Sequence, residues 1–223
     1  MNEFLTNMFG DLTELPWWGW VIVAVLLIGG AVAFMKVRGS QKVVWNARML
    51  AVGAMCIALS SVLSNIKLFS MPAGGSVTAA SMLPIMLFAF VYGPMPGITV
   101  GFVHGVLQFL MGGWFLNVWQ MLLEYPIAFA VLGLAGLCWK MKNQQLGLLI
   151  GVVIACLARW FCSTLAGVVF WGDFTNGTWA AIAYSVTYNA SYMVWECVIC
   201  GALGLLMGKR LVTELRKVKL AKV

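Results

Sequence analysis

Three long segments of the chain carry no charged side chain. Residues 15–35, 49–66 and 68–123 contain no Asp, Glu, Lys or Arg. A helix of about 20 apolar residues spans the hydrocarbon core of a bilayer, where only helices and closed barrels satisfy the backbone. The segments lack the strict two-residue alternation of an outer-membrane barrel. The pattern therefore predicts an all-α integral membrane protein.

Clusters of Pro and Gly, which interrupt helices, divide the apolar sequence into seven predicted membrane spans. These are expected at residues 17–35, 49–65, 80–92, 97–111, 121–139, 146–170 and 179–208. The third and fourth are short for full spans, so a tilt or an inward-dipping loop is expected there. Acidic residues (Glu3, Asp11 and Glu14) precede the first span, whereas a signal peptide opens with positive charge. We interpret that span as a retained helix.

Composition supports the membrane assignment and explains the net charge. The chain is 62% hydrophobic and 9% charged, with a mean hydropathy of +0.95, whereas soluble domains carry about 25% charged residues. Most basic residues fall within residues 36–48, 140–142 and 209–222. With seven spans, all three basic segments lie on the same side of the membrane. That side is predicted to be the cytoplasm, and the N-terminus is predicted to lie outside. The charge of +7 then reflects topology in the cell membrane and not nucleic-acid binding.

The six cysteines and the single histidine carry no strong chemical signal. All six cysteines lie inside predicted spans, and Cys197 and Cys200 form a CxxC with no second pair and no nearby histidine. A zinc or redox site needs more ligands than this, so we expect packing roles and no metal. His104 lies between small residues that suit close helix contact, and we interpret it as a packing histidine.

Charged residues inside membrane spans are functional candidates, because burying charge in a bilayer is costly. There are three, Glu124, Arg159 and Glu196. The alternative to a functional role is a structural one, in which these residues form a buried ion pair or cap a helix. Near the outer ends of the same spans lie aromatic rings and polar groups: Tyr125, Ser163, Trp171, Tyr184, Tyr188, Asn189 and Tyr192. A carboxylate with aromatic faces suits an organic cation. We expect an outward-facing pocket for a small, flat, cationic solute.

Three ordered motifs resemble one transporter family. They are KLFSMPAGGSVT at residues 67–78 with SMLPI at 81–85, LLEYPIAF at 122–129, and YSVTYNASY at 184–192. They resemble the thiamine-specific S-component, the substrate-binding membrane subunit, of energy-coupling-factor (ECF) transporters. The match covers residues 48–208. It implies a six-helix bundle plus one added N-terminal helix, with residues 1–42 as an outer segment and extra helix, 43–208 as the binding domain and 209–223 as a basic cytoplasmic tail.

The resemblance implies roles for particular residues. Glu124 would bind the vitamin, Trp171 would stack on it, and Tyr184 and Asn189 would contact it. Ser163 occupies the place where the family usually has histidine, and the 117–120 segment lacks an expected proline; both departures leave a ligand other than thiamine as an alternative. The loop at residues 66–79 would close the pocket. Small residues Ala54 and Ala58 would dock the transmembrane T-component.

The predicted function is therefore a high-affinity thiamine-binding subunit working with a T-component and two ATP-binding subunits, without a cofactor. The chain has no GxxxxGK[ST] sequence, so ATP hydrolysis would come from a partner. One alternative is an S-component for another ligand, such as a thiamine precursor. A membrane enzyme is a second alternative. It is disfavoured because the sequence has a single histidine and no nucleophile motif. A structural subunit is a third, but it leaves Glu124 unexplained.

Overall fold

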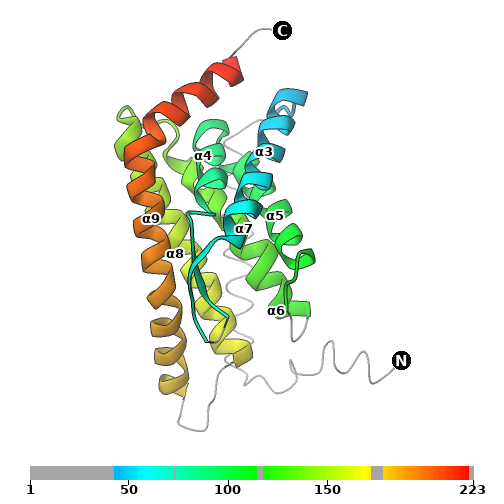
Figure 1. The fold of residues 1–223 in the computed structure, drawn as a ribbon, viewed down its shortest axis with the longest axis vertical. Helices are drawn as coiled ribbons and strands as arrows, with labels where there is room; N and C mark the ends of the chain where they lie inside the picture. The colour runs from blue at the N-terminus through cyan, green and yellow to red at the C-terminus, as the bar shows by residue number, and fades with distance from the viewer. Residues whose placement is uncertain (1–42, 73, 115–117, 172–177, 221–223) are drawn as a thin grey trace, which may run out of the picture.

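The computed structural model describes residues 43–72, 74–114, 118–171 and 178–220. In these ranges the chain forms helical segments that run along one long axis, with a small β-hairpin between the first two (Figure 1). The elements are α3 (Ala47–Asn65), β1 (Lys67–Ser70), β2 (Ser76–Thr78), α4 (Leu83–Tyr92), α5 (Pro94–Leu110), α6 (Val118–Leu122), a π-helix η2 (Leu123–Ile127), α7 (Ala128–Ala130), a 3₁₀-helix η3 (Val131–Cys138), α8 (Gln144–Trp171) and α9 (Thr178–Leu220).

The predicted all-α membrane architecture is confirmed. Within the described residues, four helical segments are long and apolar enough to cross a membrane: Ala47–Asn65, Val118–Cys138, Gln144–Trp171 and Thr178–Leu220. The two short predicted spans correspond to α4 and α5, with 10 and 17 residues. The first predicted span, residues 17–35, lies outside the described residues.

Helix α4 forms the centre of the bundle. All ten of its residues are buried, and it packs against α3, α5, η3, α8 and α9. Its sequence, LPIMLFAFVY, is apolar on every face, which is the pattern of a helix enclosed on all sides. Because protein surrounds it, its ends meet no lipid, so a helix too short to cross the bilayer is tolerated.

Two predictions about element boundaries were incomplete. The segment expected as a loop at residues 66–79 is an antiparallel hairpin that pairs Lys67 with Thr78 and Ser70 with Ser76. The predicted membrane span at residues 179–208 lies in a longer helix, which continues through the predicted tail to Leu220. This extension is anchored to the bundle, because Arg216 donates to the Trp139 carbonyl (3.3 Å) and Lys219 to the Val91 carbonyl (2.8 Å). It leans across the end of the bundle toward α3 (Figure 1).

A glycine ladder on α5, made of Gly97, Gly101 and Gly105, brings α5 into backbone contact with the 118–138 span. A Cβ added to Gly101 would overlap the Phe129 carbonyl oxygen, and one added to Gly105 would overlap the Tyr125 carbonyl oxygen. Glycines spaced four residues apart permit this close approach in membrane proteins. The backbone of the 118–138 span is therefore fixed by direct contact with α5.

The same span is broken where it carries Glu124. Residues Leu123–Ile127 form a π-helical turn around Pro126, and a 3₁₀-helix follows. Proline removes a helical N–H and crowds the preceding turn, and π-turns often occur at functional sites. The irregular backbone lies against α5 and α8, and protein contact of this kind allows non-helical geometry at membrane depth.

We predict that Gly101→Ala destabilises the protein, because its methyl group meets backbone that cannot move aside. Overpacking costs about 1–3 kcal/mol, which for a chain of this size lowers the melting temperature by roughly 2–12 °C. Thermal unfolding in detergent measures this effect. The matched control is Gly204→Ala on α9, where the nearest atom to an added Cβ is a Leu148 methyl at 3.6 Å. Equal melting temperatures for both variants would contradict the ladder's role.

Candidate functional site

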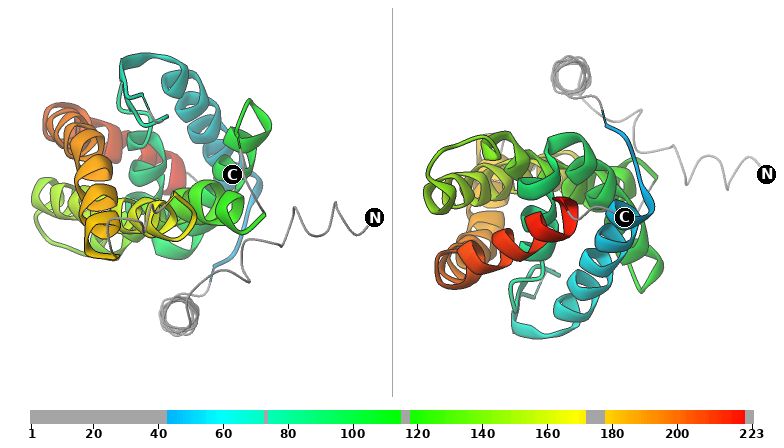
Figure 2. Two further views of the ribbon diagram at one scale, coloured as in Figure 1. Left: turned by 90° about the horizontal axis from the view of Figure 1, so that it is seen from below. Right: turned by 90° about the horizontal axis from the view of Figure 1, so that it is seen from above.

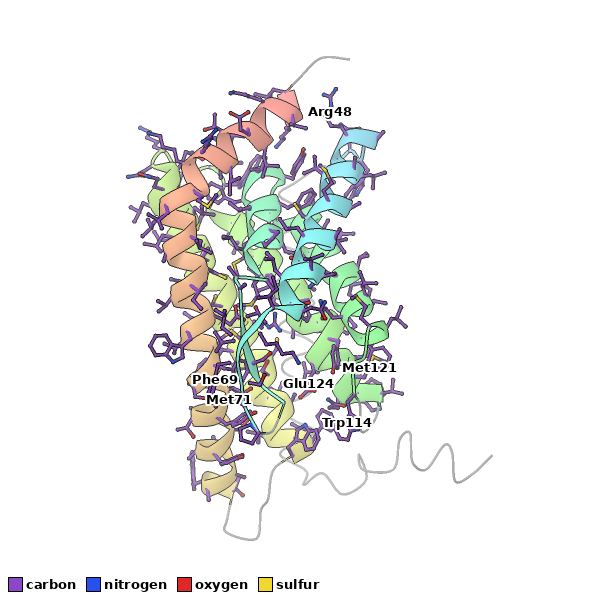
Figure 3. All side chains as sticks on the ribbon, in the orientation of Figure 1. Arg48, Phe69, Met71, Trp114, Met121 and Glu124 are labelled. Atoms are coloured by element: carbon purple, nitrogen blue, oxygen red, sulfur yellow. The ribbon has the colours of Figure 1, made fainter. Side chains whose placement is uncertain are left out.

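Most of the predicted ligand-binding residues lie toward the end of the bundle away from the C-terminus of α9. Here the hairpin, α6, η2, the end of α8 and the start of α9 come together (Figure 1). Figure 3 shows Glu124 at this end near Trp114, with the hairpin residues Phe69 and Met71, whereas Arg48 lies at the opposite end. The site and most of the basic residues therefore occupy opposite ends of the molecule.

Glu124 is a partly buried carboxylate held between an amide and an indole. The Gln120 side-chain amide donates to Glu124 Oε2, and the Trp171 side chain lies beside the same carboxylate. Gln120 is fully buried, so one wall of the site is fixed in position. No Lys or Arg nitrogen lies within 4 Å of Glu124 among the described residues. Neutral groups therefore surround the carboxylate, and its charge has no cationic partner among the described residues.

Aromatic rings line the same region. The indoles of Trp114 and Trp171 lie 5.1 Å apart between ring centroids, tilted by 31°. The Tyr125 hydroxyl is held by the Trp114 backbone, since it accepts from the amide (3.1 Å) and donates to the carbonyl (3.2 Å). Tyr125 also meets Phe109 edge-on at 5.5 Å. Rings that are tied together in this way provide flat faces beside the carboxylate.

A second polar group joins α8 to α9. The Tyr192 hydroxyl donates to Asn189 Oδ1 (2.7 Å), and the Asn189 amide donates to the carbonyls of Ser185 (2.9 Å) and Ser163 (3.4 Å). The Ser163 side chain lies beside Tyr192. Gly167 leaves room for this network, because an added Cβ would overlap the Ser185 hydroxyl. Asn189 and Ser163 are therefore brought together around Tyr192.

Tyr184 lies apart from both groups. Its side chain is 64% exposed, and its ring stacks on Tyr188 at 6.0 Å. The predicted stripe of Tyr184, Tyr188 and Tyr192 therefore runs from the outside of the bundle toward the interior. Tyr188 and Tyr192 also meet, edge to face, at 6.1 Å.

The hairpin is fastened to α9 by a second carboxylate. Glu196 is 4% exposed, and its Oε1 accepts both the backbone N–H and the hydroxyl of Thr78, each at 2.6 Å. Nearer the hairpin turn, the Gly75 N–H donates to the Tyr188 hydroxyl (3.0 Å). Figure 2 shows the hairpin lying between α3 and α9. Thr78 had not been singled out in the sequence.

The structure shows no ion pair at Arg159 or Glu196 among the described residues, although a buried ion pair was one structural alternative for the intramembrane charges. Within the described residues, no carboxylate oxygen lies within 4 Å of an Arg159 nitrogen. The guanidinium instead lies over the Phe129 ring, 3.9 Å from its centroid. Arg159 Nε and Glu196 Oε2 have no hydrogen-bond partner among the residues that the structure describes.

The remaining candidates occupy clear positions. His104 is fully buried, with its ring edge-on to Phe129 at 4.8 Å and Nδ1 3.4 Å from the Ser61 hydroxyl. Ala54 and Ala58 are exposed on the outer face of α3. All six cysteines are free thiols. The described residues contain no group of three or more His, Cys, Asp or Glu side chains arranged to hold a metal ion.

Comparison with known proteins identifies the family. The family described as "Thiamine transporter protein" matches residues 50–215, which is well over half of the chain. This chain belongs to that family. Its relatives include the thiamine transporter ThiT of Bacillus subtilis (strain 168), 36% identical over 143 residues, or 59% of this chain and 73% of that protein.

Two further matches extend the relationship. ThiT of Lacticaseibacillus paracasei is 32% identical over 53% of this chain and 66% of its own length. A solved structure of ThiT from Listeria monocytogenes superposes with a TM-score of 0.63 at 25% identity, covering 74% of this chain and 96% of that one. These transporter-family matches support a transport role and not an enzymatic one. The resemblance read from three motifs is therefore confirmed at the level of family, fold and multi-pass membrane protein.

We predict that Glu196→Gln loosens the hairpin. Replacing the carboxylate with an amide changes two charge-assisted hydrogen bonds into neutral ones, a loss of about 1 kcal/mol each, or roughly 30-fold in the opening equilibrium. Hydrogen exchange of the amides in residues 67–78 measures this opening. Glu214→Gln, at the far end of α9, is the control. Unchanged exchange of the hairpin in Glu196→Gln would show that this contact does not hold it.

Proposed function

We propose that this chain is the thiamine-binding subunit of an ECF-type uptake transporter. The observation that carries the proposal is the Glu124 carboxylate, which is oriented by Gln120 and has the aromatic faces of Trp171 and Trp114 beside it. Thiamine is a monocation with two flat heteroaromatic rings. The names of the relatives, which are thiamine transporters, support the same ligand.

The proposed binding mode follows from the chemistry of these groups. Glu124 balances the ligand's charge, and the indoles of Trp171 and Trp114 provide ring faces, where a cation–π contact contributes about 0.5–2 kcal/mol. Polar groups of the ligand exchange with the hydrogen bonds of Asn189, Ser163 and Tyr192 to fix its orientation. Tyr125 holds the Trp114 backbone in place, and Tyr184 contacts the ligand if α9 turns inward on binding.

The hairpin is proposed to close this pocket. It joins α3 to α4, and it is attached to α9 at Thr78 and Gly75, at the same end of the bundle as Glu124 (Figure 3). Opening requires these few bonds to break, which leaves the helices in place. Ligand entry from the outer side followed by closure then sequesters the cation.

Energy for uptake is proposed to come from partner subunits. The chain has no phosphate-binding GxxxxGK[ST] sequence, so two ATP-binding subunits and a T-component supply it. Ala54 and Ala58 are exposed one turn apart on the lipid-facing side of α3, with Leu50, Met55 and Leu59 exposed around them. Small residues within an apolar face permit close helix approach, which supports this face as the T-component contact.

A related ligand, such as a thiamine precursor, is the second candidate. The observation that favours it is Ser163, which stands where the resembled family usually has histidine and whose backbone carbonyl accepts from the Asn189 amide. The contact that a histidine would make with the ligand is then absent, or the hydrogen bonds among Tyr192, Asn189 and Ser163 replace it. Tryptophan-fluorescence titrations of the purified chain with thiamine and with its separate pyrimidine and thiazole halves decide between the two. The ligand with the tightest saturable quenching is the substrate.

We predict that Glu124→Gln weakens thiamine binding without unfolding the protein. The substitution keeps the side chain's size and removes its charge, so a charge-assisted contact worth about 1.5–3 kcal/mol is lost. That equals a roughly 10- to 150-fold rise in Kd, measured by calorimetry. Glu214→Gln is the matched control. Unchanged affinity in a folded Glu124→Gln variant would assign Glu124 a structural role.

We predict that Ala54→Leu with Ala58→Leu abolishes uptake while leaving thiamine binding intact, because the bulky side chains block close helix approach. The measurements are labelled-thiamine uptake by cells and binding by the purified variant. Ala202→Leu, at an exposed position of α9, is the control. Normal uptake by the double variant at normal expression would remove this face from the docking surface.

We predict an outside N-terminus and a cytoplasmic C-terminus, because the basic segments at residues 36–48, 140–142 and 209–222 should share the cytoplasmic side. Reporter fusions at both ends measure this. Two ends on the same side of the membrane would require an even number of spans and overturn the seven-span topology.

A further inference from the structure

A polar pocket lies at the end of the bundle opposite Glu124. It has a volume of about 300 Å³, room for about ten waters at roughly 30 Å³ each. It lies between the start of α8 and the C-terminal extension of α9, where these elements meet beside the η3–α8 connection (Figure 1). Its lining residues are Lys142, Asn143, Gln144, Gln145, Lys209, Val212, Thr213 and Arg216. We refer to it as the basic pocket.

The lining is strongly suited to an anion. It contains three cationic side chains, Lys142, Lys209 and Arg216, and no carboxylate. Glu214 is near in sequence but pairs with Lys217 at 2.7 Å outside the pocket. The first turn of α8 adds the positive end of a helix dipole. Three like charges around one hollow repel each other, and a bound anion relieves that repulsion.

Several contacts hold this lining in place. Arg216 is fixed by its bond to the Trp139 carbonyl (3.3 Å), and Asn143 Oδ1 accepts from the Leu146 N–H (3.2 Å). The Gln144 amide nitrogen donates to the Met141 carbonyl (2.6 Å). That bond fixes the amide's direction, so Gln144 Oε1 is a buried acceptor without a partner among the described residues. The pocket therefore presents its cations on a lining that hydrogen bonds hold in place.

Neighbouring side chains place the basic pocket at the height of the lipid headgroups. Lys219 and Lys140 lie over the Trp139 ring, 5.1 and 5.4 Å from its centroid, and Lys219 also lies 5.3 Å from the Tyr92 ring centroid. Aromatic rings with lysines beside them are typical of the membrane–water interface. Basic pockets between membrane helices at this level bind anionic headgroups.

We propose that the basic pocket binds the headgroup of an anionic phospholipid. Its phosphodiester is recognised by Lys142, Lys209 and Arg216, as in phosphatidylglycerol, whose headgroup carries no positive charge of its own. That the lipid comes from the cytoplasmic leaflet depends on the proposed orientation of the protein. The binding of the lipid does not depend on that orientation. A bound lipid links the start of α8 to the extension of α9 across the pocket.

Native mass spectrometry of the full chain in detergent, titrated with phosphatidylglycerol or phosphatidylcholine, tests the proposal. We expect tighter retention of phosphatidylglycerol. The double substitution Lys142→Gln and Lys209→Gln should weaken it by roughly 25-fold, about fivefold for each cation removed. The control, Lys140→Gln with Arg210→Gln, removes the same charge from the same end outside the pocket, and should keep wild-type affinity. If the double variant does not fold, Lys209→Gln alone should show the fivefold loss.

Three results would overturn the proposal. Equal retention of phosphatidylcholine would show that no anion is recognised, and an equal loss in the control variant would show diffuse surface attraction instead of a site. Displacement of the lipid by glycerol phosphate at comparable concentration would assign the pocket to a free phosphate ester. None of these measurements uses thiamine, so their outcome is separate from that of the proposed function.

Discussion

The backbone contact between α5 and the 118–138 span is the constraint on which the site depends. Glu124 sits on a π-helical turn around Pro126, and such a turn leaves backbone groups that lipid cannot satisfy. The glycine ladder of Gly97, Gly101 and Gly105 places α5 directly against this span. Protein contact therefore allows the helix to break there, and the break sets where the carboxylate stands relative to Trp171 and Trp114.

The two intramembrane carboxylates have different surroundings and so different uses. Glu196 is buried and accepts two hydrogen bonds from Thr78, which ties a movable hairpin to α9. Glu124 is partly buried, has neutral donors on one side and aromatic rings nearby, and suits a cationic solute. Sequence reasoning had weighed both as possible partners in an ion pair. The structure separates a carboxylate that holds the hairpin from one that faces the site.

Apolar spacing predicted the helices from α3 to α9 closely, because charges and Pro–Gly clusters mark where a span meets water. It did not predict how far α9 continues beyond the span, since the charge at Lys209 marks the membrane surface and not the end of a helix. The contact of Thr78 with Glu196 joins residues 118 apart, and no local pattern signals it. Tyr184 shares a stripe with Tyr192 but is exposed, because spacing does not fix how a helix is rotated about its axis.

The central claim is that Glu124 recognises the positive charge of the ligand. Calorimetry with thiamine and with an uncharged isostere, in which thiophene replaces the thiazolium ring, tests it most directly when both ligands are titrated into the wild type and Glu124→Gln. The account predicts that the substitution weakens thiamine binding roughly tenfold more than isostere binding, since a charge contact is worth about 1.5–3 kcal/mol. Equal losses for the two ligands would contradict it.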